Sequence, residues 1–404
     1  MKVHNEKLLE NFYKHEKTNV AILTDIYLPF SGGVSMVTDK LANSLHNSNK
    51  VNVVLISGKV KNYKDKATYP VIRCKSMPIP KAFGNCLAFP KLDFKLKKLL
   101  KKLKIDVIHI HSIFSICKFG LKFASKNNIP AIMHIHSKFS EEFPTIIKCK
   151  PICNIFVRKK YKLIDKGNLI LAVSNSTKEN LLLHNTKTPI EVLPNATDMT
   201  KFLNTQKAFE FIFEKYNIKP NEENIFLNVS RLEIECKNLK FLLESLKIVK
   251  ECGVSYKLLM VGGGPDENKL KTLIKELNLE ENVILTGSIT NREILKYYYL
   301  RADLFLFPSI VDNCPLVKLE AASQKTPTIA LENTGASEGI INGFNGYTSK
   351  NNKQAYAETI IEVLKDKEKL LQVSENCYNT LYSTWDKVAE KITVYYKKLT
   401  KKQK

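Results

Sequence analysis

The sequence predicts an α/β protein built as two doubly wound domains in series. Short apolar runs alternate with amphipathic stretches along the chain, which is typical of strand–helix units around a parallel sheet. The alternation pauses over residues 197–207, where the periodicity is weak, and then restarts. At 404 residues, 44% of them hydrophobic, the chain exceeds what one core usually supports and can bury two. We therefore expect two domains joined by a linker.

Each element follows from the same patterns. In the first half, apolar runs predict strands at residues 19–24, 51–57, 69–73, 106–111, 131–136, 169–174 and 190–194, with helices at 35–47, 93–104 and 176–185. In the second half, the strands are expected at 225–230, 256–262, 282–287, 303–309 and 327–331, with helices at 238–252, 267–277, 292–302 and 315–325. After residue 353 the pattern is almost all helical, and the last helix, 385–399, has an apolar stripe that must cover another surface. In such folds ligands bind at the carboxyl ends of strands and in the cleft between the domains.

The net charge of +23 is unevenly distributed. Residues 1–200 carry 33 Lys and Arg against 14 Asp and Glu, a net of +19, whereas the remainder carries 30 against 26, a net of +4. Such a basic half favours an anionic partner, namely a membrane surface, a lipid-linked phosphate or an acidic polymer; a generally lysine-rich composition is the alternative. Residues 75–104 and 140–166 mix apolar and basic side chains and are candidates for an acceptor-binding or membrane-facing surface, or for a solvated lysine face.

Nothing in the sequence predicts a membrane span or a signal peptide. The chain contains no run of about 18 apolar residues, and its first residues are polar and charged. The nine cysteines are scattered, so we expect reduced, mostly buried thiols. The expectation is a soluble cytoplasmic protein, with peripheral contact to the inner face of the cell membrane through the basic half.

Two loops of the predicted strand–helix units are suited to phosphate. Gly32 and Gly33 lie where a strand leads into a helix, so backbone N–H groups there can approach a ligand closely, although a tight turn explains the pair equally well. In the second domain, Arg231 follows the first strand and Lys237 precedes the next helix, which predicts a diphosphate clamp; surface ion pairs are the alternative. The chain has no Asp-x-Asp motif for a chelated metal, so protein cations are expected to neutralise the diphosphate.

Two further segments complete the motif set. Gly263, with a glycine on each side, ends the second strand of this domain and serves either for close approach to a nucleotide or for the turn itself. Asp312 lies in a loop after a strand, and Glu320 lies eight residues later in a helix expected to begin near Pro315. A carboxylate can hold vicinal hydroxyls such as those of a ribose, and the backbone of residues 313–316 could bind sugar hydroxyls or phosphate.

The order of these motifs resembles family 4 of the retaining glycosyltransferases, over about residues 18–400. The acid-x7-Glu motif, with Pro-Ser before it and Glu-Ala-x5-Pro after it, is the most specific part. The resemblance implies the GT-B fold, in which two Rossmann-like domains face each other across a cleft and the C-terminal helix crosses back to the N-terminal domain. The implied domains are an acceptor-binding domain at 1–200, a nucleotide-sugar donor-binding domain at 201–380 and the returning helix at 381–404.

The resemblance also implies roles for individual residues. Arg231 and Lys237 would bind the donor diphosphate and act in catalysis, and Glu320 would bind the ribose. Asp312 would hold the transferred sugar together with the backbone of Asn313, Cys314, Pro315 and Leu316, and Gly32 and Gly33 would lie near the donor phosphates. The sequence departs from the family, which usually has Glu at position 312, Phe-Gly at 314–315 and often Gly at 325, where this chain has Lys325. The shorter Asp312 leaves the identity of the donor sugar open.

All eight histidines lie within residues 1–184. His109 and His111 share one strand face, as do His134 and His136, because strand side chains alternate. Four imidazoles could bind a transition metal, but no acidic or thiol ligand accompanies them at a recognised spacing, so we expect no metal. His136, which ends its strand, is expected to contact the sugar at the reaction centre, with a structural role for His109 and His134.

The predicted function is a retaining, metal-independent hexosyltransferase. It would move a sugar from a nucleotide-diphospho-sugar, expected to be a UDP-sugar, to a glycan or lipid-linked acceptor in envelope polysaccharide, capsule or glycolipid synthesis, with no cofactor beyond the donor. One alternative is a GT-B nucleotide-sugar hydrolase or epimerase, which product analysis with and without acceptor would reveal. The other is a nucleic-acid-binding protein, suggested by the basic half, but the sequence has no recognised nucleic-acid motif.

Overall fold

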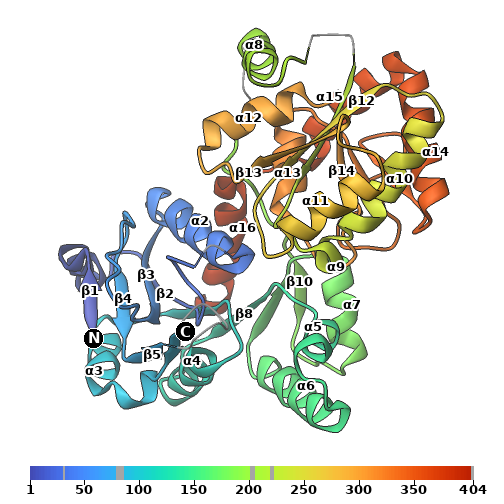
Figure 1. Cartoon of the computed structure of the whole chain (residues 1–404). Coiled ribbons are helices and arrows are strands. Elements are labelled where there is room, and N and C mark those ends of the chain that lie inside the picture. Colours follow the sequence, from blue (N-terminus) through green and yellow to red (C-terminus); the bar gives the residue numbers. More distant parts are fainter. Residues whose placement is uncertain (31, 79–85, 201–204, 219–222, 402–404) are drawn as a thin grey trace. The chain divides into compact units, whose positions relative to one another are not determined.

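The computed structural model describes the chain apart from residues 31, 79–85, 201–204, 219–222 and 402–404. The chain forms two compact units (Figure 1). The N-terminal unit comprises Met1–Asn195 together with Thr384–Lys404, and the C-terminal unit comprises Ala196–Ser383.

The N-terminal unit is built around an eight-stranded sheet of order β1-β4-β3-β2-β7-β8-β9-β10. All neighbouring strands are parallel except β1 and β4. The strands are β1 (Lys2–His4), β2 (Thr18–Leu23), β3 (Val51–Gly58), β4 (Val71–Cys74), β7 (Val107–Ile110), β8 (Ala131–Ile135), β9 (Leu169–Ala172) and β10 (Ile190–Val192), and β5 (Ser76–Pro78) pairs separately with β6 (Cys86–Ala88). The helices are α1 (Glu10–Lys14), α2 (Gly33–Asn47), α3 (Phe94–Lys102), α4 (Ser115–Lys126), α5 (Phe139–Ile146), α6 (Lys150–Ile164), α7 (Asn175–Leu183) and α16 (Trp385–Lys401).

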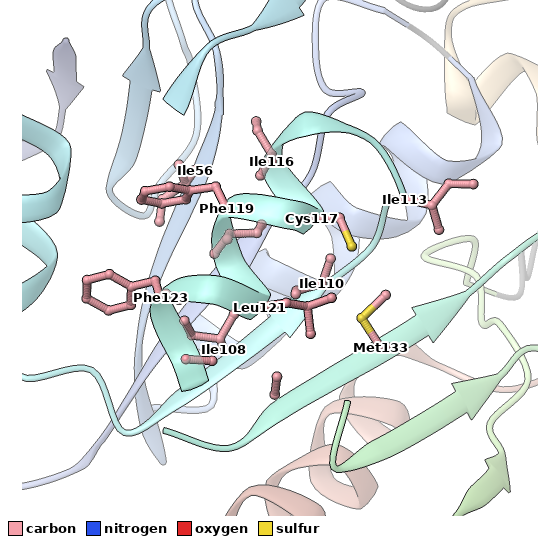
Figure 2. Packing of buried hydrophobic residues seen from close by; sticks show 14 of the residues in the cluster. Ile56, Ile108, Ile110, Ile113, Ile116, Cys117, Phe119, Leu121, Phe123 and Met133 are labelled. Atoms are coloured by element: carbon pink, nitrogen blue, oxygen red, sulfur yellow. The ribbon is translucent and has the colours of Figure 1, made fainter. Parts of the chain in front are cut away.

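The two faces of this sheet differ in chemistry. On one face, Ile108 and Ile110 of β7 and Met133 of β8 join an apolar core with α4 (Figure 2). On the other face, α16 packs against α2 and β7. Tyr396 of α16 is fully buried there. The apolar stripe of the last helix therefore covers a surface of the N-terminal unit, to which the family resemblance implies that this helix returns.

The C-terminal unit contains a six-stranded, fully parallel sheet of order β13-β12-β11-β14-β15-β16. Its strands are β11 (Asn224–Val229), β12 (Tyr256–Val261), β13 (Val283–Gly287), β14 (Leu304–Phe307), β15 (Thr328–Leu331) and β16 (Tyr347–Ser349). Its helices are α8 (Thr205–Tyr216), α9 (Ile234–Lys237), α10 (Leu239–Glu251), α11 (Glu267–Glu276), α12 (Arg292–Arg301), α13 (Leu316–Ser323), α14 (Lys353–Lys365) and α15 (Lys367–Leu381). Apolar cores lie on both faces of the sheet, which accounts for the continuous apolar runs of its central strands β11, β12 and β14.

Every strand expected from the sequence is present, and its ends coincide with the expected ones or differ from them by one or two residues. The three-residue strands β1, β5, β6 and β16 were missed because so short a segment carries little periodicity. The expected linker at 197–207 was partly wrong, since α8 begins at Thr205. Side-chain caps begin several helices at polar residues that precede apolar runs, namely Asp93, Ser174, Asn291, Asn352 and Asp366.

None of the cysteines whose side chains the structure describes forms a disulfide, but only four of these eight are buried, fewer than expected. Among the described residues, no helix combines the length and the apolar composition needed to cross a membrane.

Candidate functional site

The candidate site of the C-terminal unit lies where the strand order reverses direction. β11 pairs with β12 on one side and with β14 on the other, although β12 and β13 intervene between β11 and β14 in the sequence. The loops after β11, β12 and β14 therefore emerge beside one another at the carboxyl edge of the sheet. Parallel α/β sheets bind ligands at this kind of reversal because the loops on its two sides diverge.

The glycines after β12 bring two loops into backbone contact. Gly262 has φ +152°, and a Cβ added there would lie 1.9 Å from the carbonyl oxygen of Ser230. A Cβ on Gly264 would lie 2.4 Å from the carbonyl oxygen of Leu232. At Gly263 the nearest atom would be the side-chain Oγ of Ser288, at 2.7 Å. Close packing of loop against loop thus explains Gly262 and Gly264, whereas only a side chain crowds Gly263.

Lys237 and Asp312 meet at this edge. Lys237 Nζ donates to both carboxylate oxygens of Asp312, at 2.9 and 2.7 Å, across 75 residues of sequence. Ser309 Oγ donates to Asp312 Oδ2 at 2.5 Å. Behind the loop, Gly335 lies so close that an added Cβ would be 2.4 Å from the carbonyl oxygen of Asp312. The carboxylate is therefore held by a cation and a hydroxyl, and the backbone of Asp312 is packed against Gly335.

Arg231 does not join this pair. Its side chain is 65% exposed, and its guanidinium pairs with Glu233 at 3.1 Å. Lys237 lies at the end of α9, whose first amide, that of Ile234, donates to the carboxylate of Asp266 at 3.1 Å. The predicted clamp thus consists of one cation held by Asp312 and one cation exposed to solvent.

The segment 313–316 differs from the prediction in one respect. Helix α13 begins at Leu316, and Pro315 precedes it as the N-cap with extended backbone angles, φ −67° and ψ 128°. Proline has no N–H group, so Pro315 cannot donate a backbone hydrogen bond to a ligand, and the donors expected over the whole segment are limited to Asn313, Cys314 and Leu316. Pro315 offers no side-chain cap to the first turn of α13.

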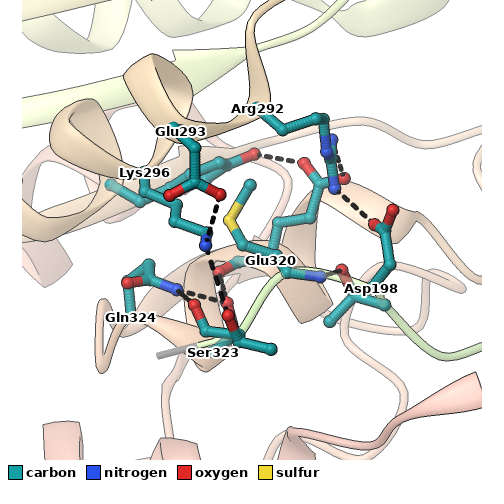
Figure 3. Close-up of polar contacts among 11 residues, drawn as sticks. Asp198, Arg292, Glu293, Lys296, Glu320, Ser323 and Gln324 are labelled. Carbon is teal, nitrogen blue, oxygen red and sulfur yellow. Dashed lines mark hydrogen bonds and ion pairs between the residues drawn. The ribbon is translucent and has the colours of Figure 1, made fainter. Parts of the chain in front are cut away.

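Glu320 is buried in α13, and both of its carboxylate oxygens are bonded (Figure 3). Arg292 Nη1 donates to Oε1 at 2.8 Å, and the Tyr299 hydroxyl donates to Oε2 at 3.0 Å. Arg292 also reaches Asp198 through Nη2 at 2.9 Å. Burial disfavours the charged guanidinium, but Glu320 and Asp198 outweigh it, so the pKa of Arg292 is raised. Burial and the neighbouring Glu320 raise the pKa of Tyr299 well above its usual value.

The partners of Glu320 were missed by the sequence analysis. Arg292 begins α12 and Tyr299 lies two turns later, and neither forms a motif with Glu320 at a spacing that the sequence reveals. Lys296 and Gln324 were also missed; they hold Thr200 through its hydroxyl and its carbonyl oxygen, at 3.2 and 2.9 Å. This network ties the first residues of the C-terminal unit to α12 and α13 (Figure 3).

The predicted residues of the N-terminal unit lie on two different elements. Gly32 is the N-cap of α2 and Gly33 is its first residue. No described atom lies within 4 Å of a Cβ added at Gly33, so the space in front of this backbone is open. His136 directly follows β8, and its Nε2 is 3.1 Å from Nδ1 of His111. Burial lowers the pKa of His136 to about 3, so the ring is neutral at physiological pH.

The first of the two mixed basic stretches contributes to a hollow on the N-terminal unit. Lys91, Lys97 and Lys101 join Lys122 and Lys126 of α4 around a space of about 660 Å³, whose apolar lining is Phe119 and Phe123. Leu92 and Phe94 beside it are 61% and 76% exposed. No acidic side chain lines this hollow among the residues that the structure describes.

Both units match known proteins. Residues 209–380 match the family model described as glycosyl transferases group 1, and residues 31–201 match that of glycosyltransferase family 4. The capsular polysaccharide biosynthesis glycosyltransferase CapH of Staphylococcus aureus is 30% identical over 303 residues, which cover 72% of this chain and 75% of CapH. Alpha-monoglucosyldiacylglycerol synthase of Streptococcus pneumoniae is 27% identical over 321 residues, covering 77% of this chain and 70% of the synthase.

A solved structure shows the same fold. Anabaena HepE in complex with UDP superposes on this chain with a TM-score of 0.75 at 16% identity, over 94% of this chain and 100% of the other.

Proposed function

This chain belongs to family 4, group 1 of the glycosyltransferases and has the GT-B fold, and from that premise we propose that it transfers the hexose of a UDP-hexose to a lipid-linked or glycan acceptor with retention of anomeric configuration. The observation that carries the proposal is the meeting of Lys237 and Asp312 at the carboxyl edge of β11 and β14, with Glu320 in helix α13, which follows the loop of Asp312. The C-terminal unit is assigned the donor and the N-terminal unit the acceptor.

The charges at the donor edge suit a diphosphate. An ammonium has three donors, so Lys237 can reach a phosphate oxygen while its two bonds to Asp312 persist. Arg231 is exposed, and an exposed pair such as Arg231–Glu233 contributes only about 0–1 kcal/mol, so a diphosphate can replace Glu233 at little cost. Because these side chains neutralise the leaving group, the mechanism that we propose uses no metal at the donor site.

The ribose is assigned to Glu320. Each of its oxygens accepts one bond from the protein, which leaves lone pairs for two vicinal hydroxyls. Arg292 and Tyr299 fix the carboxylate in one orientation, so the ribose meets an acceptor that is already positioned. The sugar hydroxyls are assigned to Asp312 and to the backbone amides of Asn313, Cys314 and Leu316.

In the proposed reaction, the bond between C1 of the sugar and the β-phosphate oxygen breaks, and its electron pair leaves with the diphosphate. The acceptor oxygen forms the new bond to C1 from the same face, and the departing phosphate takes the acceptor proton. Lys237 and Arg231 stabilise the negative charge that develops on the leaving group, a type of contribution often worth a few kcal/mol per donor, about 3–4 for one well-placed group. His136, neutral at physiological pH, is assigned to a hydrogen bond with the sugar.

The acceptor is proposed to be bound at an anionic membrane surface. Five lysines around one hollow, with the exposed apolar side chains of Leu92 and Phe94 beside it, suit phosphate headgroups and the adjoining acyl region. The synthase relative is named for a diacylglycerol glycolipid and CapH for capsular polysaccharide, so both acceptor classes are candidates.

Donor turnover tests the proposed reaction. The protein is incubated with a panel of UDP- and GDP-sugars, with and without membrane lipid extract, and release of the nucleoside diphosphate is followed. Acceptor-dependent release from a UDP-hexose and a product whose anomeric coupling matches the donor are expected. Release that does not depend on acceptor identifies a hydrolase, and inverted product contradicts the retaining mechanism.

Vesicle sedimentation tests the membrane contact separately. Vesicles containing phosphatidylglycerol should retain the protein and pure phosphatidylcholine vesicles should not. The double variant Lys97→Glu/Lys101→Glu should lose this retention, whereas the matched variant Lys269→Glu/Lys271→Glu on α11 should keep it. Equal retention of both variants would remove the hollow from the proposal.

A further inference from the structure

Four imidazoles lie together inside the N-terminal unit. His109 and His111 come from β7 and the residue after it, and His134 and His136 from β8 and the residue after it. The register pairs Ile110 with Met133, so the next residues, His111 and His134, lie side by side. Strand alternation directs these imidazoles away from the apolar core of α4, toward the face on which α16 packs.

Several nitrogens in this cluster have no hydrogen-bond partner. They are Nε2 of His109, Nε2 of His111 and both ring nitrogens of His134, in side chains that are 0%, 3% and 2% exposed. A buried polar atom without a partner destabilises a fold, and native proteins rarely keep several together. Such a group of orphaned nitrogens requires an explanation.

The remaining nitrogens of two of these rings are anchored. Nδ1 of His109 is 2.7 Å from the hydroxyl of Tyr396, and Nδ1 of His111 is 3.1 Å from Nε2 of His136. A metal-binding histidine usually donates its second ring N–H to a fixed partner, which sets the tautomer and aims the other nitrogen at the metal. His109 and His111 have this arrangement, with Nε2 left as the ligand atom.

The spacing of the rings suits one ion. The ligand nitrogens of His109, His111 and His134 lie within 4.8 Å of one another. The ring centroids are 4.4, 4.8 and 5.3 Å apart. A tetrahedral zinc ion bound at about 2.0–2.1 Å separates its ligand nitrogens by about 3.4 Å and the imidazole centroids by about 5 Å. The centroids are therefore already at the required spacing, and turning the rings, His134 most of all, brings the nitrogens together.

We propose that His109, His111 and His134 bind one divalent transition-metal ion of the zinc class, with the fourth coordination position left for water. The side-chain chemistry indicates this class, because three imidazoles without a thiolate or a carboxylate favour Zn²⁺ and Co²⁺ over Mg²⁺ or Ca²⁺. Burial lowers the pKa of His109 to about 3 and holds those of His111 and His134 well below the usual value, so all three rings are in the neutral form that binds metal.

None of the three ligands is assigned to the donor, although His111 is bonded to His136, which is assigned to the sugar; the ion would act on structure. The ion would join β7 to β8 directly and to α16 through the hydrogen bond between His109 Nδ1 and the hydroxyl of Tyr396. No metal was expected from the sequence because acidic and thiol ligands were absent; three imidazoles with an open position form a recognised ligand set without them. The inference does not depend on the reaction that the protein catalyses.

Cobalt and zinc titrations test the site. The full chain is prepared without a histidine tag and stripped with a chelator, and Co²⁺ is added while the visible spectrum is followed. One equivalent of Co²⁺ should bind with the absorption bands of a tetrahedral complex, and Zn²⁺ should displace it. Zn²⁺ should also raise the urea midpoint of the N-terminal unit, read from the fluorescence of Trp385, the only tryptophan in the sequence. Absence of these cobalt bands overturns the proposal.

Variants distinguish this site from adventitious binding. His134→Leu should abolish the tetrahedral cobalt spectrum, and Tyr396→Phe, which removes only the anchor of His109, should weaken metal affinity by about 10-fold or more. The control His184→Leu changes a partly exposed histidine that stacks on Tyr161, and should bind as the unaltered protein does. His109→Leu repeats the test if His134→Leu does not fold. Cobalt bands in His134→Leu that are as strong as those in the control His184→Leu overturn the proposal.

Discussion

Two regions satisfy their polar groups in opposite ways: the donor edge of the C-terminal unit, formed by Lys237, Asp312 and Glu320, and the histidine face of the N-terminal unit, formed by His109, His111 and His134. At the donor edge, the predicted charges are paired: Lys237 with Asp312, Arg231 with Glu233, and Glu320 with Arg292. On the histidine face, three buried rings retain nitrogens without a partner. Charges near solvent can be paired within the chain and still exchange partners with a ligand. Buried neutral nitrogens cannot exchange with water, so their partner must be built in or bound.

The largest expected effect comes from breaking the donor edge. Lys237→Ala should lower the turnover of donor by about 100-fold or more, because it removes a cation from the leaving group and leaves Asp312 without its cationic partner. Glu320→Ala should have an effect of similar size through loss of the ribose contact. Turnover is measured by release of the nucleoside diphosphate, with circular dichroism as a check on folding.

Lys271→Ala is the matched control. This lysine pairs with Glu267 on the exposed face of α11 at 2.9 Å, so its loss should leave turnover within about twofold. Near-normal turnover in both Lys237→Ala and Glu320→Ala would remove the donor assignment altogether.

The next effect is on the free energy of unfolding. It compares the two carboxylates that bind Arg292, namely the buried Glu320 and the more exposed Asp198. Glu320→Gln leaves Arg292 and Tyr299 facing a neutral amide in a buried position, and should destabilise the C-terminal unit by about 1–3 kcal/mol. Asp198→Asn removes the more exposed partner of the same guanidinium and should cost less than about 1 kcal/mol. Hydrogen exchange of peptides from α12 and α13 in increasing urea measures both. Equal losses would show that solvent does not screen the outer pair.

Alanine substitutions at one glycine of each unit should change stability by amounts similar to those of the preceding pair. Gly264→Ala forces a Cβ within 2.4 Å of a backbone oxygen, so the loops after β11 and β12 must separate, at a cost of about 1–3 kcal/mol. Gly33→Ala meets open space at the start of α2 and should stabilise by about 0.4–1 kcal/mol. Thermal unfolding of both variants is compared with that of the unaltered chain. A stable Gly264→Ala variant would show that the loop moves freely.

The sequence predicted those parts of both regions that depend on local spacing. Strand order along the chain, the helix starts and the acid-x7-Glu motif are all short-range patterns, so the candidate residues Lys237, Asp312 and Glu320 could be named in advance. The bond between Lys237 and Asp312 spans 75 residues and exists because β11 lies beside β14, an adjacency that periodicity does not encode.

The partners that the sequence analysis missed share this origin. Arg292 and Tyr299 reach Glu320 only because α12 and α13 are brought together by the sheet. The pair of His-x-His segments could be seen in the sequence, but the anchoring of His109 by Tyr396 spans 287 residues and had no local signal. The N-cap position of Pro315 likewise depends on backbone angles, which residue identity alone does not fix.

The smallest expected effect is a gain in stability rather than a loss. It tests directly whether the buried histidine nitrogens lack partners, in contrast to the paired charges of the donor edge. In metal-free protein, His134→Leu replaces two unpartnered nitrogens by apolar atoms of similar volume, so the N-terminal unit should keep its stability or gain up to about 1 kcal/mol. Urea unfolding followed by the fluorescence of Trp385 measures the change, because this side chain is buried in α16 on the histidine face of the unit. Removal of a satisfied polar group would instead cost about 1–3 kcal/mol. A loss of that size in metal-free protein would mean that the ring nitrogens of His134 already have a bound partner such as water, and that the two regions satisfy their polar groups in the same way.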